Sequence, residues 1–132
     1  MNLKYSALYV LVLISCISCQ GITQSESTHG KVHHIVVCWL KEPDNAEARQ
    51  RVIDASYSLS GIPGVIDVRA GTVLPDPRPT VDSSFDVALV ITFESESALR
   101  EYVKHPLHQN AVETTIKPLV ARYIAYDFID GR

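Results

Sequence analysis

The chain has 132 residues, a formal net charge of −3 at pH 7, 46% hydrophobic residues and 20% charged residues. This length and composition suit one globular domain with a packed core, and they argue against a chain that is disordered throughout. No basic run alternates with aromatic residues, so the composition gives no support for nucleic-acid binding.

The first segment has the features of an export signal. Lys4 is the only charged residue among residues 1–20, and residues 5–14 form an unbroken run of apolar and small side chains. A membrane-spanning helix needs roughly 20 apolar residues, so the run favours a signal peptide over a transmembrane anchor. The sequence therefore predicts a signal peptide over residues 1–15 and export of the rest.

Two cysteines, Cys16 and Cys19, lie where the apolar run ends, and each follows a serine. This pattern resembles the bacterial lipobox, in which a cysteine is acylated and becomes the new N-terminus. Cys16 is the preferred site because Leu13 lies three residues before it. We expect a lipoprotein anchored in the cell membrane, facing the periplasm or the cell exterior, with residues 16–30 as a polar tether. The alternative is cleavage by the ordinary signal peptidase, which yields a soluble secreted protein.

The folded domain is expected over residues 31–132 and opens with a strand over residues 31–40. The pattern alternates strongly, and both faces are largely apolar, which predicts a strand covered on two sides. One face carries Val32, His34, Val36, Cys38 and Leu40, and the other carries His33, Ile35, Val37 and Trp39. Cys38 is expected as a buried free thiol, because one remote cysteine makes no disulfide framework, although a bond to Cys19 is the alternative.

A helix and a second strand follow. Asp44 is a candidate N-cap, and Glu47 three residues later completes a capping-box pattern. The helix runs to about Ser60, and one stripe carries Val52, Ala55, Ser56 and Leu59. Residues 61–64 contain two glycines and a proline that end it, and residues 65–73 read as a strand. One face of that strand is expected to carry Ile66, Val68 and Ala70.

Residues 74–84 contain three prolines, which predict an extended arm that can pack against a partner subunit. The third strand is expected over residues 85–93. Ser95 then caps a short helix that runs through Lys104, and Pro106 restarts the helix at its favoured first-turn position. The buried side of the second part carries Val112, Ile116 and Leu119. Residues 122–129 alternate as the fourth strand.

The order strand, helix, strand, strand, helix, strand predicts an α+β fold of the ferredoxin-like kind, with a four-stranded antiparallel sheet and helices on one face. The other face is also substantially apolar. A symmetric homodimer that pairs two such sheets is the economical cover.

The candidate chemistry lies in residues 102–108, which hold Tyr102, His105 and His108 around a proline, and in His34 on the first strand. Histidine titrates near neutrality and tyrosine can donate a proton, so His108 is a candidate base and Tyr102 a candidate acid. His105, directly before the proline, is expected to cap the helix instead. His33 points away from His34, towards the dimer face.

A metal site is the other use of clustered histidines. His105 and His108 are three residues apart, with His34 as a possible third ligand. No acidic residue or cysteine completes the ligand spacing, and the proline disfavours regular helix at His105. The sequence therefore predicts no metal, and no motif points to haem or another cofactor.

Three groups of residues carry a resemblance to a known family: Val32-His33-His34-Ile35-Val36-Val37, then Ile62-Pro63-Gly64-Val65, then Phe93-Glu94-Ser95 with Tyr102, His105-Pro106 and His108. As a set they resemble the stress-responsive dimeric A/B barrel (Dabb) family over about residues 31–130. The resemblance implies that two ferredoxin-like protomers pair their sheets into a barrel.

Within the family the chain is similar to proteins like olivetolic acid cyclase, a plant polyketide cyclase. That similarity implies a cavity in which His34, Tyr102 and His108 act as acid and base. Val87 and Ala55 stand where the cyclase has a histidine and a tyrosine, which implies a different reaction.

Three functions follow as hypotheses. The first is a small lyase or cyclase that acts on an apolar carbonyl compound. The second is a binding module that holds a small apolar ligand without transforming it. The third is a stress-related structural dimer, in which the histidines are core and interface residues.

Overall fold

The computed structural model describes residues 30–131. The expected signal peptide, both candidate lipidation sites and nearly all of the tether lie outside the described residues. Within the described part, no helix is both long enough and apolar enough to cross a membrane.

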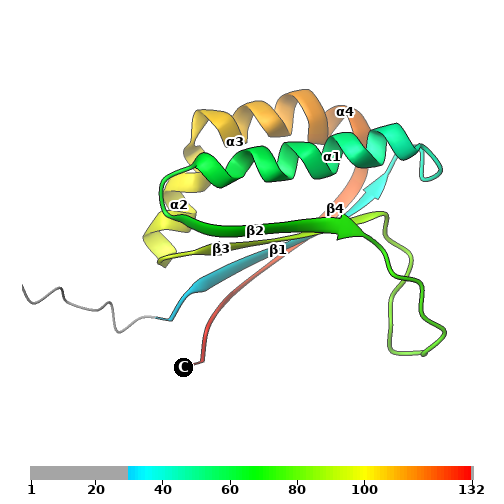
Figure 1. The fold of residues 1–132 in the computed structure, drawn as a ribbon, viewed down its shortest axis with the longest axis horizontal. Coiled ribbons are helices and arrows are strands. Elements are labelled where there is room, and N and C mark those ends of the chain that lie inside the picture. The colour runs from blue at the N-terminus through cyan, green and yellow to red at the C-terminus, as the bar shows by residue number, and fades with distance from the viewer. Residues whose placement is uncertain (1–29, 132) are drawn as a thin grey trace, which may run out of the picture.

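A four-stranded antiparallel sheet has all of its helices on one face, as Figure 1 shows. The strands lie in the order β2-β3-β1-β4, so β2 and β4 are the edges. The elements in chain order are β1 (Val32–Leu40), α1 (Ala46–Ser58), η1 (Leu59–Gly61), β2 (Val65–Thr72), β3 (Val87–Phe93), α2 (Glu96–Lys104), α3 (Pro106–Ala111), the π-helical turn η2 (Val112–Ile116), α4 (Lys117–Leu119) and β4 (Val120–Ile129). The predicted ferredoxin-like arrangement is confirmed.

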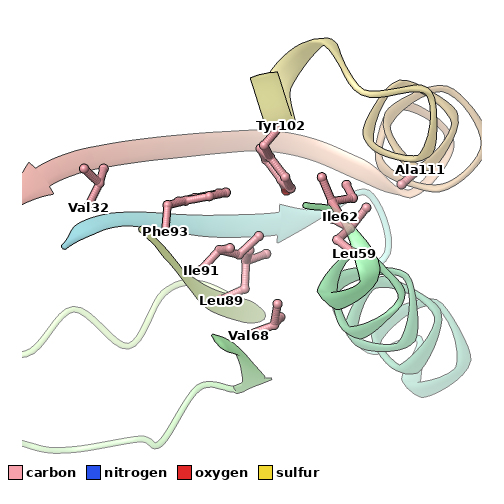
Figure 2. Close-up of a cluster of buried hydrophobic side chains, with 9 residues drawn as sticks. All are labelled: Val32, Leu59, Ile62, Val68, Leu89, Ile91, Phe93, Tyr102 and Ala111. Carbon is pink, nitrogen blue, oxygen red and sulfur yellow. The ribbon is translucent and has the colours of Figure 1, made fainter. Parts of the chain in front are cut away.

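The core fills the space between the sheet and the helices. Every second residue of β3 is buried, as a strand with one covered face requires. From α1, the predicted stripe contributes Val52, Ser56 and the following Leu59, all buried. Figure 2 shows the largest cluster, in which Phe93 of the sheet lies beside Tyr102 of α2.

Two local predictions are wrong. The N-cap of α1 is Asn45, not Asp44, because the Asn45 side chain accepts a hydrogen bond from the Ala48 amide at 2.9 Å. In β2 the register shifts between Val65 and Asp67, so Ile66 is the extra residue of a bulge. Ile66 is therefore 45% exposed, and Val65 packs against the core in its place.

Element boundaries also differ from the predictions. The third strand begins at Val87 instead of residue 85, and the fourth begins at Val120 instead of residue 122. Asp86 lies directly before the third strand and is buried, and its carboxylate accepts a hydrogen bond from the Leu40 amide at 2.8 Å. The helix that Pro106 starts passes through the π-helical turn η2, which inserts a residue into the helical repeat.

Within residues 30–131, no helix covers the second face of the sheet. β1 and β4 place aromatic and aliphatic side chains there, and Tyr126 is 56% exposed. The predicted arm between β2 and β3 extends to this side of the sheet (Figure 1). The described chain thus leaves an apolar sheet face and a long apolar edge strand uncovered.

Candidate functional site

A cavity of about 650 Å³ lies between the sheet and the helices. Its walls come from β1, β3, β4, α1, α2, α3 and the turn η2, and most of the lining side chains are apolar. His34, Tyr102 and His108 all line it. The structure therefore brings the three predicted site residues to one cavity, although they come from β1, α2 and α3.

Tyr102 lies in the last turns of α2 and is only 2% exposed. Its ring packs edge-on against Phe93 with centroids 4.9 Å apart, and it lies 4.6 Å from the ring of His108. Figure 2 shows the ring directed from the helix towards the sheet. Burial raises the pKa of the Tyr102 phenol well above its ordinary value, so the hydroxyl stays protonated.

The Tyr102 hydroxyl opens into the cavity. In the described part of the chain, no hydrogen bond involves this oxygen, yet no fully buried side-chain nitrogen or oxygen lacks a partner. The oxygen is therefore not fully buried, and Tyr102 lines the cavity. The hydroxyl is a neutral donor available to a ligand.

His108 lies in the first turn of α3, directly after the proline turn. Its Nδ1 lies 3.0 Å from the Val103 carbonyl, which can only accept, so Nδ1 carries the hydrogen and Nε2 holds the lone pair. Burial lowers the pKa of His108, while the Val103 carbonyl raises it and charge on His34 lowers it. The neutral imidazole is thus the favoured form at pH 7, as a general base requires.

His34 is held by a residue that the sequence did not predict. Its Nδ1 lies 2.6 Å from an Asp127 carboxylate oxygen, and the two residues are direct cross-strand partners on β1 and β4. The carboxylate fixes the ring orientation and places the hydrogen on Nδ1. The His34 ring lies 6.2 Å from that of Tyr102. The one available signal was that Asp127 is the single acidic residue of the aromatic strand β4.

The other two histidines of the described residues, His105 and His33, do not join this cluster. His105 caps α3, since its Nδ1 accepts from the Leu107 amide at 3.2 Å, as expected of the residue before the proline. His33 lies on the other face of the sheet, stacked on Phe128 at 4.8 Å and hydrogen-bonded to Asp130 and Thr92.

Cys38 is a free, buried thiol in the cavity wall, and burial raises its pKa to about 11. It is therefore a thiol, not a thiolate, at neutral pH. Among the residues described, no group of three His, Cys, Asp or Glu side chains is arranged to hold a metal ion.

The one-sided sheet and the cavity beneath its helices define an α+β protein of the ferredoxin-like class. The profile of the family described as "Stress responsive A/B Barrel Domain" (Dabb) matches residues 32–130, and the chain belongs to this family. A search of curated proteins found no match.

Several solved structures share the fold. A Dabb family protein with a ferredoxin-like fold from Mesorhizobium loti is 27% identical, with a TM-score of 0.62, and the alignment covers 76% of this chain and 96% of that one. A dimeric ferredoxin-like protein of unknown function from Thermobifida fusca is 24% identical, with a TM-score of 0.63 and coverage of 77% and 92%. The hydroxynitrile lyase from Passiflora edulis is 20% identical, with a TM-score of 0.64 and coverage of 78% and 95%.

Proposed function

We propose that the protein binds a small, largely apolar carbonyl compound in the cavity and catalyses a proton transfer of the lyase or cyclase type. The observation that carries the proposal is the meeting of His34, Tyr102 and His108 at one cavity. A mainly apolar cavity with a few convergent polar groups is the usual form of a small-molecule site.

The proposed chemistry uses the protonation states derived above. Nε2 of His108 accepts a proton from the carbon next to the carbonyl, and the Tyr102 hydroxyl donates a hydrogen bond to the oxygen as enolate charge develops. Nε2 of His108 then returns the proton to the product of the cyclase or lyase reaction, which restores the neutral imidazole. His34, oriented by Asp127, offers its second ring nitrogen to the same ligand. This scheme uses both the buried Tyr102 ring and the half-buried His108 ring, whose centroids lie 4.6 Å apart.

The reaction is proposed to differ from that of the plant cyclase. The cavity has Ala55 in its wall, and Val87, which is fully buried in the core, cannot supply a polar group. The Passiflora relative, a hydroxynitrile lyase, shares the fold, which supports a scaffold that can carry lyase chemistry. This likeness does not identify the substrate of the present protein.

Hydrogen exchange tests the proposal with a panel of simple carbonyl compounds in place of the natural substrate. Apolar aldehydes and ketones are incubated with the protein in D₂O, and loss of the α-hydrogen signal is followed by NMR. Exchange above the background rate is expected for the wild type. His108→Ala should lower it by about 100-fold, because a general base typically contributes roughly 10²–10⁴-fold.

The matched control is His105→Asn, which removes an imidazole outside the cavity and keeps a capping side chain. It should leave exchange unchanged. Undiminished exchange in a folded His108→Ala protein would overturn the assignment of the base.

A binding module without catalysis is the second candidate, favoured by the apolar residues at positions 55 and 87. It predicts saturable binding of an apolar ligand that is recovered chemically unchanged. If substitutions in the cavity wall abolish ligand binding while the wild type catalyses no α-hydrogen exchange, the binding module is favoured over the enzyme.

The protein is further proposed to form a homodimer through the uncovered face of the sheet. The apolar face supports this, and so does the edge strand β4, whose outer side pairs with no strand in the described chain. Several similar solved structures are also described as dimeric. Sedimentation at micromolar concentration should give a dimer, and Tyr126→Lys should shift it towards the monomer. A wild-type monomer would contradict both the barrel and a purely structural role for the dimer.

Export with lipidation at Cys16 remains a proposal about residues outside the described part. It predicts that the full chain partitions into the detergent phase on Triton X-114 separation and that Cys16→Ala moves it to the aqueous phase. If Cys19→Ala has that effect instead, the anchor is Cys19, and an aqueous wild-type protein means a soluble secreted product.

A further inference from the structure

We infer that the cavity binds an amphipathic anion, with an apolar body along β1 and a carboxylate at Lys41. The inference rests on the proposed ligand-binding role of the cavity and names the chemical class of the ligand. Its first support is the charge of the wall. The lining includes the basic residues Lys41, Lys117 and Arg122 and no aspartate or glutamate.

This charge distribution is not a reflection of the whole chain. Aspartate and glutamate outnumber lysine and arginine, 15 to 12, and the formal net charge is −3. An unpaired cation beside an apolar, low-dielectric wall attracts a ligand group of the opposite sign. The inference therefore depends on which of these lining cations has no carboxylate partner.

Among the three cations, Lys41 is the one available to a ligand. The ammonium of Lys117 is paired with Glu113, and the Arg122 guanidinium stacks on the Trp39 ring, 3.6 Å from its centroid. Lys41 donates to the carbonyl oxygen of Lys117 at 2.7 Å, and no described carboxylate lies within ion-pair distance of it. An ammonium has three hydrogens, so two remain for a carboxylate.

The backbone also holds Lys41 in place. Its amide donates to the Leu119 carbonyl at 2.9 Å, which ties the end of β1 to the start of β4. The Lys41 backbone is therefore fixed beside the cavity wall, and its ammonium is directed to the Lys117 carbonyl.

The distance between the two polar ends sets the shape of the ligand. Lys41 follows His34 by seven positions, and at about 3.3 Å per strand residue this is about 23 Å between the backbones. Apolar wall residues lie between them, with Val36, Cys38 and Leu89 on the sheet side. The ligand is thus an elongated apolar chain with a carboxylate at Lys41 and its reactive group near Tyr102.

Three probes of equal chain length separate charge from apolar burial: decanoate, decan-1-ol and decylamine. Binding is measured by calorimetry at one fixed pH and ionic strength for all three probes. Decanoate should bind about 10-fold more tightly than decan-1-ol, the scale of one charge-assisted hydrogen bond, and decylamine should bind most weakly.

The variant Lys41→Met keeps the aliphatic stem and removes the charge, so it should abolish the preference for decanoate without loss of decan-1-ol binding. The matched control is Lys104→Met, which removes an exposed cation of α2 that pairs with Glu101 outside the cavity wall. That variant should retain the preference.

The outcomes separate this inference from the proposed function. Equal binding of decanoate and decan-1-ol overturns the anion preference and leaves the ligand cavity standing. A preference that persists in folded Lys41→Met overturns the assignment to Lys41. Failure of all three probes to bind overturns both the inference and the apolar cavity function.

Discussion

Replacement of Tyr102 by phenylalanine distinguishes a site residue from a core residue. The ring is part of the core, with its edge-on contact to Phe93 at 4.9 Å, whereas the hydroxyl has no partner in the described chain. Tyr102→Phe retains the ring and removes only the oxygen. If the hydroxyl serves a ligand, the variant should change function and leave stability nearly intact.

The two effects differ in magnitude. Loss of an oxygen that donates to no protein group should change the free energy of unfolding by less than about 1 kcal/mol. Tyr102→Ala, in contrast, empties a core position and should cost about 3–5 kcal/mol. In the exchange assay, Tyr102→Phe should lower the rate by about 100-fold, since it removes the group that stabilises the developing enolate.

Urea unfolding followed by circular dichroism measures the first quantity, and α-hydrogen exchange measures the second. Equal destabilisation by Tyr102→Phe and Tyr102→Ala would show that the hydroxyl has a structural partner and would refute its assignment to a ligand. Equal exchange by the wild type and by Tyr102→Phe would refute its role in the proposed reaction.

Three further predictions concern the cavity, the pH response and the bulge. Ala55 and Ala111 line both the main cavity and a second depression of about 330 Å³ between α1 and α3. Ala55→Phe should therefore narrow the main cavity and weaken decanoate binding at least about 10-fold. Unchanged affinity for decanoate would contradict the placement of Ala55 in the cavity wall. Burial lowers the pKa of His108 in the folded state. As the pH falls through the ordinary pKa of 6.5, the unfolded chain therefore binds a proton at His108 before the folded protein does. The free energy of unfolding should thus decrease as the pH drops below about 6.5. Urea unfolding at pH 7 and pH 5 should show a smaller fall for His108→Gln, and equal falls would refute this cause. In β2, Val65→Lys should lower the free energy of unfolding by about 2 kcal/mol, whereas Ile66→Lys should leave it within about 0.5 kcal/mol, and the reverse order would contradict the bulge.

Much of the fold was predictable because its signals are local. The alternation in β1 and β3 and the serine cap of α2 each depend on a few neighbouring residues. The errors arose where two local solutions compete. Asp44 and Asn45 are adjacent and both are good caps, and residues 65 and 66 are both β-branched and apolar, so only the pairing with β3 decides which one faces the core.

The candidate site was predictable only in part for the same reason. Tyr102 and His108 are six residues apart, and the resemblance to the family added His34. Asp127 was missed because its hydrogen bond to His34 spans 93 residues of sequence and depends on the register between β1 and β4. Lys41 was missed because the charge of a cavity wall is a property of residues from many elements at once.

The break between α2 and α3 explains why the two closest residues of the cluster meet. On one continuous helix, six residues correspond to about 600° of rotation, which would leave Tyr102 and His108 roughly 120° apart around the axis and about 9 Å apart along it. The residue before a proline is driven to extended backbone, and His105 has φ −65° and ψ 137°. The chain therefore turns, and His108 folds back onto the Val103 carbonyl with its ring 4.6 Å from Tyr102. The structural role of His105 and Pro106 is thus what makes the proposed acid and base neighbours.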